Sequence, residues 1–164
     1  MITYLKGDAT APQGDGPKII PHVVNTLGGW GAGFVLAVSN RWPGPESAYR
    51  QWHREKAHKD VCGDDKRFVL GSVQVLQVKP DIWVANMLAQ QGMGRSGPKG
   101  PPLHYFSLSK CLEWVALCAL EKKATVHMPR IGTGLAGGRW DIIEPLISES
   151  LCGRGVGVFV YDLV

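Results

Sequence analysis

The stretch Pro129-Arg-Ile-Gly-Thr-Gly-Leu-Ala-Gly-Gly-Arg-Trp140 decides the fold of this chain. It follows a short apolar segment, residues 125–128, and a helical pattern begins at its end. Four of its residues within a span of seven are glycine. Glycine lets the backbone approach a ligand closely, and the N–H groups at a helix start attract anions. The stretch matches neither of the two common phosphate-binding motifs: it has no Gly-Lys-Ser/Thr ending, and it does not have the first-strand context of Gly-x-Gly-x-x-Gly. It therefore predicts either a ligand-binding loop or a structural turn.

A second glycine-rich segment, Thr26-Leu-Gly-Gly-Trp-Gly-Ala-Gly-Phe34, follows an apolar segment over residues 19–25. It also leads into a helical pattern, predicted over residues 32–41. Ligands of open α/β sheets bind outside the carboxyl ends of the strands. Two such loops facing each other would hold a pyrophosphate through their backbone N–H groups.

The rest of the chain alternates between strand and helix patterns. Strands are predicted at residues 2–6, 19–25, 68–78, 82–88, 125–128 and 155–161, and helices at 32–41, 45–59, 103–122 and 141–151. A turn signal, Lys79-Pro80-Asp81, predicts that 68–78 and 82–88 are antiparallel neighbours. This order predicts an α/β fold, a three-layer α/β/α sandwich with a mixed central sheet. The 164 residues fit a single domain, 1–164.

One loop and several single residues leave alternatives open. Residues 89–102 are rich in Gly, Pro and Gln, and loops of this length are usually functional or disordered. Asp8 follows the first strand, where it would either accept from a ligand or cap a turn. Trp30 would either cover a ligand or fill the core. His22 and His127 fall in strands and are expected to be core or hydrogen-bonded residues. The five histidines show no metal-ligand spacing, so no metal is expected.

Composition indicates a soluble globular protein, with 45% hydrophobic and 20% charged residues. The net charge of +4 favours polyanionic partners only weakly. We expect no signal peptide and no membrane span, and a cytoplasmic location. The four cysteines show no Cys-x-x-Cys spacing, and reduced, packed thiols are expected.

Five segments in this order resemble the macrodomain family, and the resemblance covers essentially the whole chain. They are Gly7-Asp8-Ala9-Thr10, Asn25 with Gly29-Trp30-Gly31-Ala32-Gly33-Phe34, Asn86-Met87, Pro129-Arg-Ile-Gly-Thr-Gly-Leu135, and Val160-Tyr161. The branch most similar to the chain includes terminal ADP-ribose protein glycohydrolase. The resemblance implies a three-layer sandwich that binds ADP-ribose. No cofactor is expected, because binding would rest on backbone amides.

Individual roles follow from the resemblance alone. Asp8 would accept from the adenine amino group, and Ala9 would contribute its backbone. Asn25 and the loop 29–34 would line the distal ribose, which is the one not attached to adenine, and the phosphates. Tyr161 would pack near the adenine. The ligand-binding residues implied in this way are Asp8, Ala9, Trp30, Gly31, Ala32, Gly33, Phe34, Ile131, Gly132, Thr133, Gly134, Leu135 and Tyr161.

The chain departs from that glycohydrolase at its catalytic positions. Ala89-Gln90-Gln91 stands where the glycohydrolase has a lysine, and Ala136 stands where it has an aspartate. Neither glutamine nor alanine can act as nucleophile or general base. The nearby Asp141 is expected to be a helix cap. Hydrolysis would then use a water held by the candidate catalytic residues Asn25, Gln90 and Gln91, because an ester's carboxylate leaving group needs little acid assistance.

The sequence thus predicts a bacterial-type mono-ADP-ribosyl hydrolase that releases ADP-ribose from modified acidic side chains of proteins. The expected partners are ADP-ribose and ADP-ribosylated macromolecules. Three alternatives stay open: a non-catalytic ADP-ribose reader, a hydrolase acting on ADP-ribosylated nucleic acid, and a phosphatase acting on ADP-ribose-1″-phosphate. A steep salt dependence of turnover on a DNA acceptor would favour the hydrolase acting on nucleic acid. Release of phosphate would favour the phosphatase.

Overall fold

The computed structural model describes residues 1–60, 65–92 and 101–164. The centre of the predicted loop 89–102, most of the predicted loop 61–66 and Cys62 therefore lie outside the described residues.

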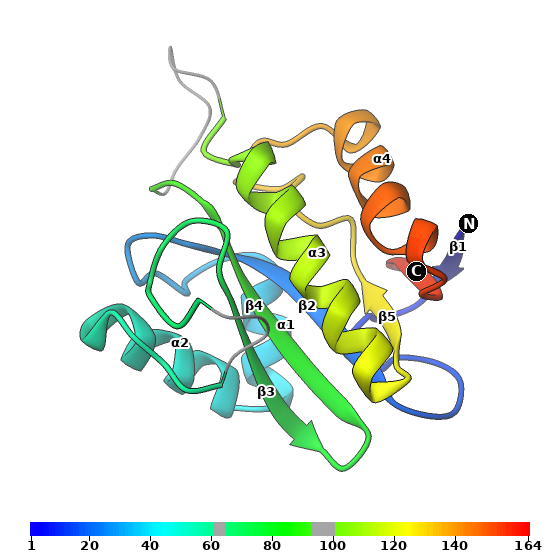
Figure 1. Cartoon of the computed structure of the whole chain (residues 1–164), viewed down its shortest axis with the longest axis horizontal. Coiled ribbons are helices and arrows are strands. Elements are labelled where there is room, and N and C mark those ends of the chain that lie inside the picture. Colours follow the sequence, from blue (N-terminus) through cyan, green and yellow to red (C-terminus); the bar gives the residue numbers. More distant parts are fainter. Residues whose placement is uncertain (61–64, 93–100) are drawn as a thin grey trace.

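One mixed sheet forms the middle of the molecule (Figure 1). Within the described residues its strand order is β1-β6-β5-β2-β4-β3. The bounds are β1 (Ile2–Lys6), β2 (Lys18–Asn25), β3 (Val73–Lys79), β4 (Ile82–Gln90), β5 (Thr125–Met128) and β6 (Val158–Asp162). β3 is antiparallel to β4, as predicted, and the other neighbouring pairs are parallel.

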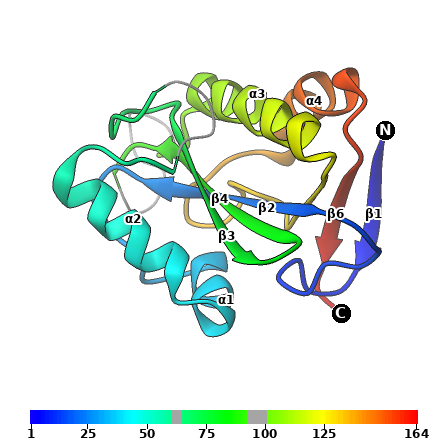
Figure 2. The same cartoon turned by 60° about the horizontal axis from the view of Figure 1, so that its bottom comes forward.

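Helices cover both faces of this sheet (Figure 2). α1 (Phe34–Arg41) and α2 (Gly44–Glu55) lie on one face, and α3 (Tyr105–Lys122) and α4 (Trp140–Ser150) lie on the other. A short 3₁₀ turn, η1 (Cys152–Arg154), links α4 to β6. The predicted three-layer α/β/α sandwich with a mixed sheet is confirmed.

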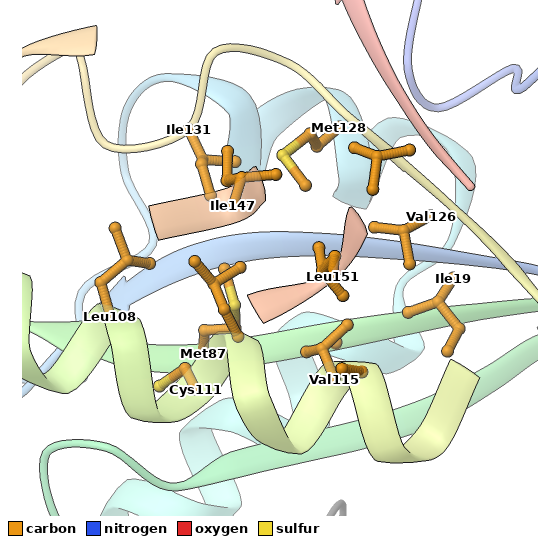
Figure 3. Packing of buried hydrophobic residues seen from close by; sticks show 14 of the residues in the cluster. Ile19, Met87, Leu108, Cys111, Val115, Val126, Met128, Ile131, Ile147 and Leu151 are labelled. Carbon is orange, nitrogen blue, oxygen red and sulfur yellow. The ribbon is translucent and has the colours of Figure 1, made fainter. Parts of the chain in front are cut away.

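Each face of the sheet has its own core. Consecutive strand residues point to opposite faces, so Ile19 packs in one cluster and Ile20 in the other. The larger cluster joins α3 and α4 to the sheet, and Figure 3 shows Leu108 and Val115 of α3 in it with Met128 of β5. The smaller cluster lies under α1 and α2 and contains Trp30, Tyr49 and Trp52.

Two expectations need correction. The predicted strand 68–78 begins only at Val73, because Gly71 has φ +97° and the Ser72 hydroxyl donates to the carbonyls of Arg67 and Val69, which makes a turn. Reduced thiols were expected throughout, and Cys111 and Cys152 are free, but Cys118 is disulfide-bonded. Among the helices that the structure describes, none is both long and apolar enough to cross a membrane.

Candidate functional site

The parallel strands end at one edge of the sheet, and a cleft lies there. Loop 26–33 leaves β2 for α1, and loop 129–139 leaves β5 for α4. The cleft between them has two adjoining parts of about 180 and 160 Å³. The two parts share five lining residues, namely Val23, Ala32, Val35, Gln90 and Leu135. Both predicted glycine-rich loops therefore face one cleft.

Loop 129–139 is folded tightly on itself. Gly138 N–H donates to the Gly132 carbonyl at 2.8 Å, and Gly137 N–H donates to the Gly134 carbonyl at 3.0 Å. Gly132 has φ +74°, and a Cβ at Gly138 would lie 2.4 Å from a methyl carbon of Leu103. These two positions require glycine because a side chain would be strained or would overlap the core. Gly134, by contrast, faces open space on the cleft.

Asn25 organises the other loop. Its amide nitrogen donates to the Gly29 carbonyl at 2.9 Å, and its amide oxygen accepts from Leu27 N–H at 2.9 Å and Gly29 N–H at 3.2 Å. The hydroxyl of Tyr49 also lies 3.0 Å from that oxygen. The side chain of Asn25 is thus used mainly to fix the shape of loop 26–33.

Trp30 fills the core. Only 3% of it is exposed, and its ring packs edge-on against His22 with the ring centres 5.2 Å apart. It also lines the second part of the cleft, so Trp30 fills the core and borders the cleft at the same time.

The two candidate glutamines differ in their surroundings. Gln90 ends β4, is half-buried, and lines both parts of the cleft. Its amide nitrogen donates to the Gly92 carbonyl at 3.1 Å, and its amide oxygen has no hydrogen-bond partner among the described residues. Gln91 is exposed and lines neither part. Of the two glutamines, only Gln90 lines the cleft.

Asp8 and Tyr161 are occupied by neighbouring groups. The Asp8 carboxylate accepts from the N–H and hydroxyl of Thr10 at 2.8 and 2.7 Å, and Arg41 lies 3.6 Å from it. Burial alone would raise the pKa of Asp8, but these partners lower it below its ordinary value. The Tyr161 hydroxyl accepts from Gln13 N–H and lies 2.8 Å from Nδ1 of His127.

The structure brings most of the predicted site residues to the cleft. Those that line it are Asn25, Trp30, Gly31, Ala32, Gly33, Phe34, Gln90, Ile131, Gly132, Gly134 and Leu135. Those that line neither part are Asp8, Ala9, Thr133, Gln91 and Tyr161.

Sequence reasoning missed His22 and Arg130 as lining residues. His22 alternates with Ile20 and Val24 along β2, and this pattern indicated only a buried strand residue. Arg130 is held by Asp162 through two hydrogen bonds of 2.7 and 3.0 Å. It is the one charged residue among the described lining residues. In the described part of the chain, no three or more His, Cys, Asp or Glu side chains are grouped to hold a metal ion.

Two solved structures are close in both sequence and fold. A macrodomain protein from Streptomyces coelicolor is 52% identical, with 99% of both chains covered and a TM-score of 0.83. A protein of unknown function from Bacteroides thetaiotaomicron is 48% identical, with 99% of this chain and 98% of that chain covered and a TM-score of 0.91. Thermosipho africanus DarTG in complex with ADP-ribose is 18% identical over 89% of this chain and 38% of that chain, with a TM-score of 0.62, and shares the fold.

Curated relatives are more distant. Chromodomain-helicase-DNA-binding protein 1-like of Danio rerio is 31% identical over 98% of this chain, but this chain spans only 15% of that protein. An ADP-ribose 1''-phosphate phosphatase of Candida albicans is 26% identical over 91% of this chain and 93% of its own length. No family model matches the chain.

Proposed function

This chain belongs to the macrodomain family, and we propose on that basis that its cleft binds ADP-ribose and that the protein hydrolyses mono-ADP-ribose from modified acidic side chains. Residues 1–164 would form one such domain. The observation that carries the proposal is the pair of glycine-rich loops facing each other across the cleft, because their backbone suits a diphosphate. The names of two relatives, the DarTG complex with ADP-ribose and the ADP-ribose 1''-phosphate phosphatase, support this choice of ligand.

Gln90 is the residue best placed to take part in hydrolysis. It lies at the junction of the two parts of the cleft, and its amide oxygen, which has no partner among the described residues, can accept from a water molecule. A held water attacks the anomeric carbon of the distal ribose, the bond from that carbon to the acceptor's carboxylate oxygen breaks, and the carboxylate leaves as a stable anion. The water's proton passes to solvent or to the ligand's diphosphate. Asn25 acts by positioning loop 26–33. Gln91 would affect hydrolysis only indirectly, through the position of Gln90.

A non-catalytic reader of ADP-ribose is the second candidate. The observation that favours it is the lining itself, in which the described residues include neither a lysine nor a carboxylate. A domain with this lining can bind through backbone groups without supplying a strong base. Release of ADP-ribose from nucleic acid would be a variant of the first proposal.

A time course with a carboxylate-linked mono-ADP-ribosylated protein separates these candidates. Free ADP-ribose is followed by mass spectrometry with enzyme well below substrate concentration. Gly134→Glu is the control, because its side chain enters open space and places a carboxylate against the diphosphate. Gly134→Gln has the same shape without the charge. Repeated turnovers that Gly134→Glu abolishes support the hydrolase, whereas binding without release supports the reader.

A further inference from the structure

Two buried nitrogen atoms beside the cleft have no hydrogen-bond partner in the described part of the chain. They are Nδ1 of His22 and Nε1 of Trp30. Only 2% of His22 and 3% of Trp30 are exposed. A buried polar atom left unpaired costs about 1–3 kcal/mol, so native proteins rarely keep one without a reason.

The two side chains contact each other, and each borders one part of the cleft. His22 lines its first part and Trp30 lines its second. Their rings lie 5.2 Å apart, centre to centre, at an interplanar angle of 86°. Gln90, the proposed water-positioning residue, lines both parts. The two side chains that carry the unpaired nitrogens therefore border the place where the reacting sugar is proposed to bind.

Hydrogen bonds fix the chemical character of His22. Gln74 donates through Nε2 to the Ala48 carbonyl, so its Oε1 is the atom that accepts from Nδ2 of Asn86. The Oδ1 of Asn86 must then accept from Nε2–H of His22, at 2.6 Å. Burial lowers the pKa of His22 to about 4, so the ring is neutral at pH 7. Nδ1 is consequently an acceptor without a hydrogen.

The pair thus offers one donor and one acceptor. Nε1–H of Trp30 can only donate, and Nδ1 of neutral His22 can only accept. A hydroxyl group satisfies both atoms at once because it accepts through oxygen and donates its proton. A phosphate oxygen, which carries no proton at neutral pH, would satisfy Trp30 alone.

We propose that His22 and Trp30 form a specificity subsite for one hydroxyl group of the distal ribose of ADP-ribose. This inference rests on the proposed binding of ADP-ribose. Both nitrogens are covered by neighbouring atoms, so the hydroxyl reaches them through a small shift of loop 26–33. That loop has glycines on both sides of Trp30, and Gly28 and Gly33 already have φ of +78° and +82°.

The first test compares ADP-ribose with ADP, which lacks the distal ribose. Trp30→Phe removes the N–H and keeps an aromatic ring. Calorimetric titration should show affinity for ADP-ribose about three- to tenfold lower in this variant, the range for one neutral hydrogen bond, with affinity for ADP unchanged. Equal losses for both ligands, or no loss for either, would overturn the subsite.

Trp52→Phe is the matched control. Trp52 lies in the same core cluster and is fully buried, and its Nε1 also has no partner among the described residues. It lines neither part of the cleft. The same substitution there should lower the melting temperature without changing the ratio of the two affinities. If the ratio of the two affinities changed equally in Trp30→Phe and Trp52→Phe, the loss of any buried indole would explain it and the subsite would be wrong.

A second measurement needs no variant. The indole ¹H–¹⁵N signals of the wild-type protein are recorded during titration with each ligand. ADP-ribose should shift the Trp30 signal strongly, ADP should shift it little, and the Trp52 signal should stay in place. A Trp30 signal that responds equally to both ligands contradicts the subsite. If the wild-type protein binds neither ligand, the proposed function itself is wrong.

Discussion

Gln90 and Gln91 are neighbours in sequence but differ in what they can touch. Gln90 lines the cleft, and its amide oxygen has no partner in the part of the chain that the structure describes. Gln91 is exposed, and its backbone N–H donates to the Pro102 carbonyl. The sequence offered the two residues as equal candidates, because alternation along a strand does not show where the strand ends. β4 runs two residues further than predicted, and this extension places Gln90 at its last position.

Replacing each glutamine tests this difference. Gln90→Ala should lower turnover of a carboxylate-linked substrate by about one to two orders of magnitude, because the attacking water loses its position. Gln91→Ala should leave turnover within about twofold of wild type, since surface changes away from the site have small effects. Initial rates under substrate saturation measure both. Equal rates for Gln90→Ala and wild type would remove Gln90 from the mechanism.

At the scale of elements, the sequence predicted most of the fold. The two glycine-rich loops, the antiparallel pair β3–β4 and the alternation of strands with helices were all readable, because apolar periodicity and Gly or Pro turns are local signals. The start of β3 could not be predicted from the sequence, because the turn at Ser72 depends on hydrogen bonds to carbonyls that periodicity does not reveal. The partners Arg41 of Asp8 and His127 of Tyr161 were also hidden, since they come from distant segments. The hydrogen bonds from Thr10, by contrast, match the turn-cap alternative given for Asp8.

The loop between β5 and α4 should be intolerant of side chains at specific positions. A Cβ at Gly138 would lie 2.6 Å from the Gly132 carbonyl oxygen and 2.4 Å from Leu103, whereas one at Gly134 would meet nothing within 4 Å. Gly138→Ala should therefore lower the free energy of unfolding by about 1–3 kcal/mol and weaken ADP-ribose binding. Gly134→Ala should change stability by less than about 0.5 kcal/mol. Urea unfolding of both variants measures this, and equal stabilities would contradict the packing described.

At the scale of the whole molecule, two buried histidines should make stability depend on pH. Burial lowers the pKa of His22 to about 4, and burial with the nearby Lys18 charge lowers that of His127 to about 4, against 6.5 for a free histidine. Between these values the unfolded chain binds more protons than the folded one, so stability falls as the pH falls from 6.5 towards 4. Each histidine contributes about 3 kcal/mol at most, which is present in full above pH 6.5.

Urea unfolding at pH 7.5, 6.5, 5.5 and 4.5 follows this loss. The midpoint should be constant above pH 6.5 and should drop steadily below it. His127→Gln should reduce the slope, because one of the histidines that contribute to it is then missing. The carboxylates with lowered pKa, such as Asp8, affect stability only near and below their ordinary value of 3.8, so they do not account for a drop in this window. A flat profile from pH 7.5 to 4.5 would show that these histidines are not buried as described.

The most direct test of the account is calorimetric titration of the whole chain with ADP-ribose. The wild-type protein should bind one molecule. Gly134→Glu should bind about tenfold more weakly or worse, because its carboxylate would lie a few ångströms from the diphosphate, and Gly134→Gln should lose less. Failure of the wild-type protein to bind ADP-ribose, or equal affinity in wild type and Gly134→Glu, would contradict the claim that this cleft is the ADP-ribose site.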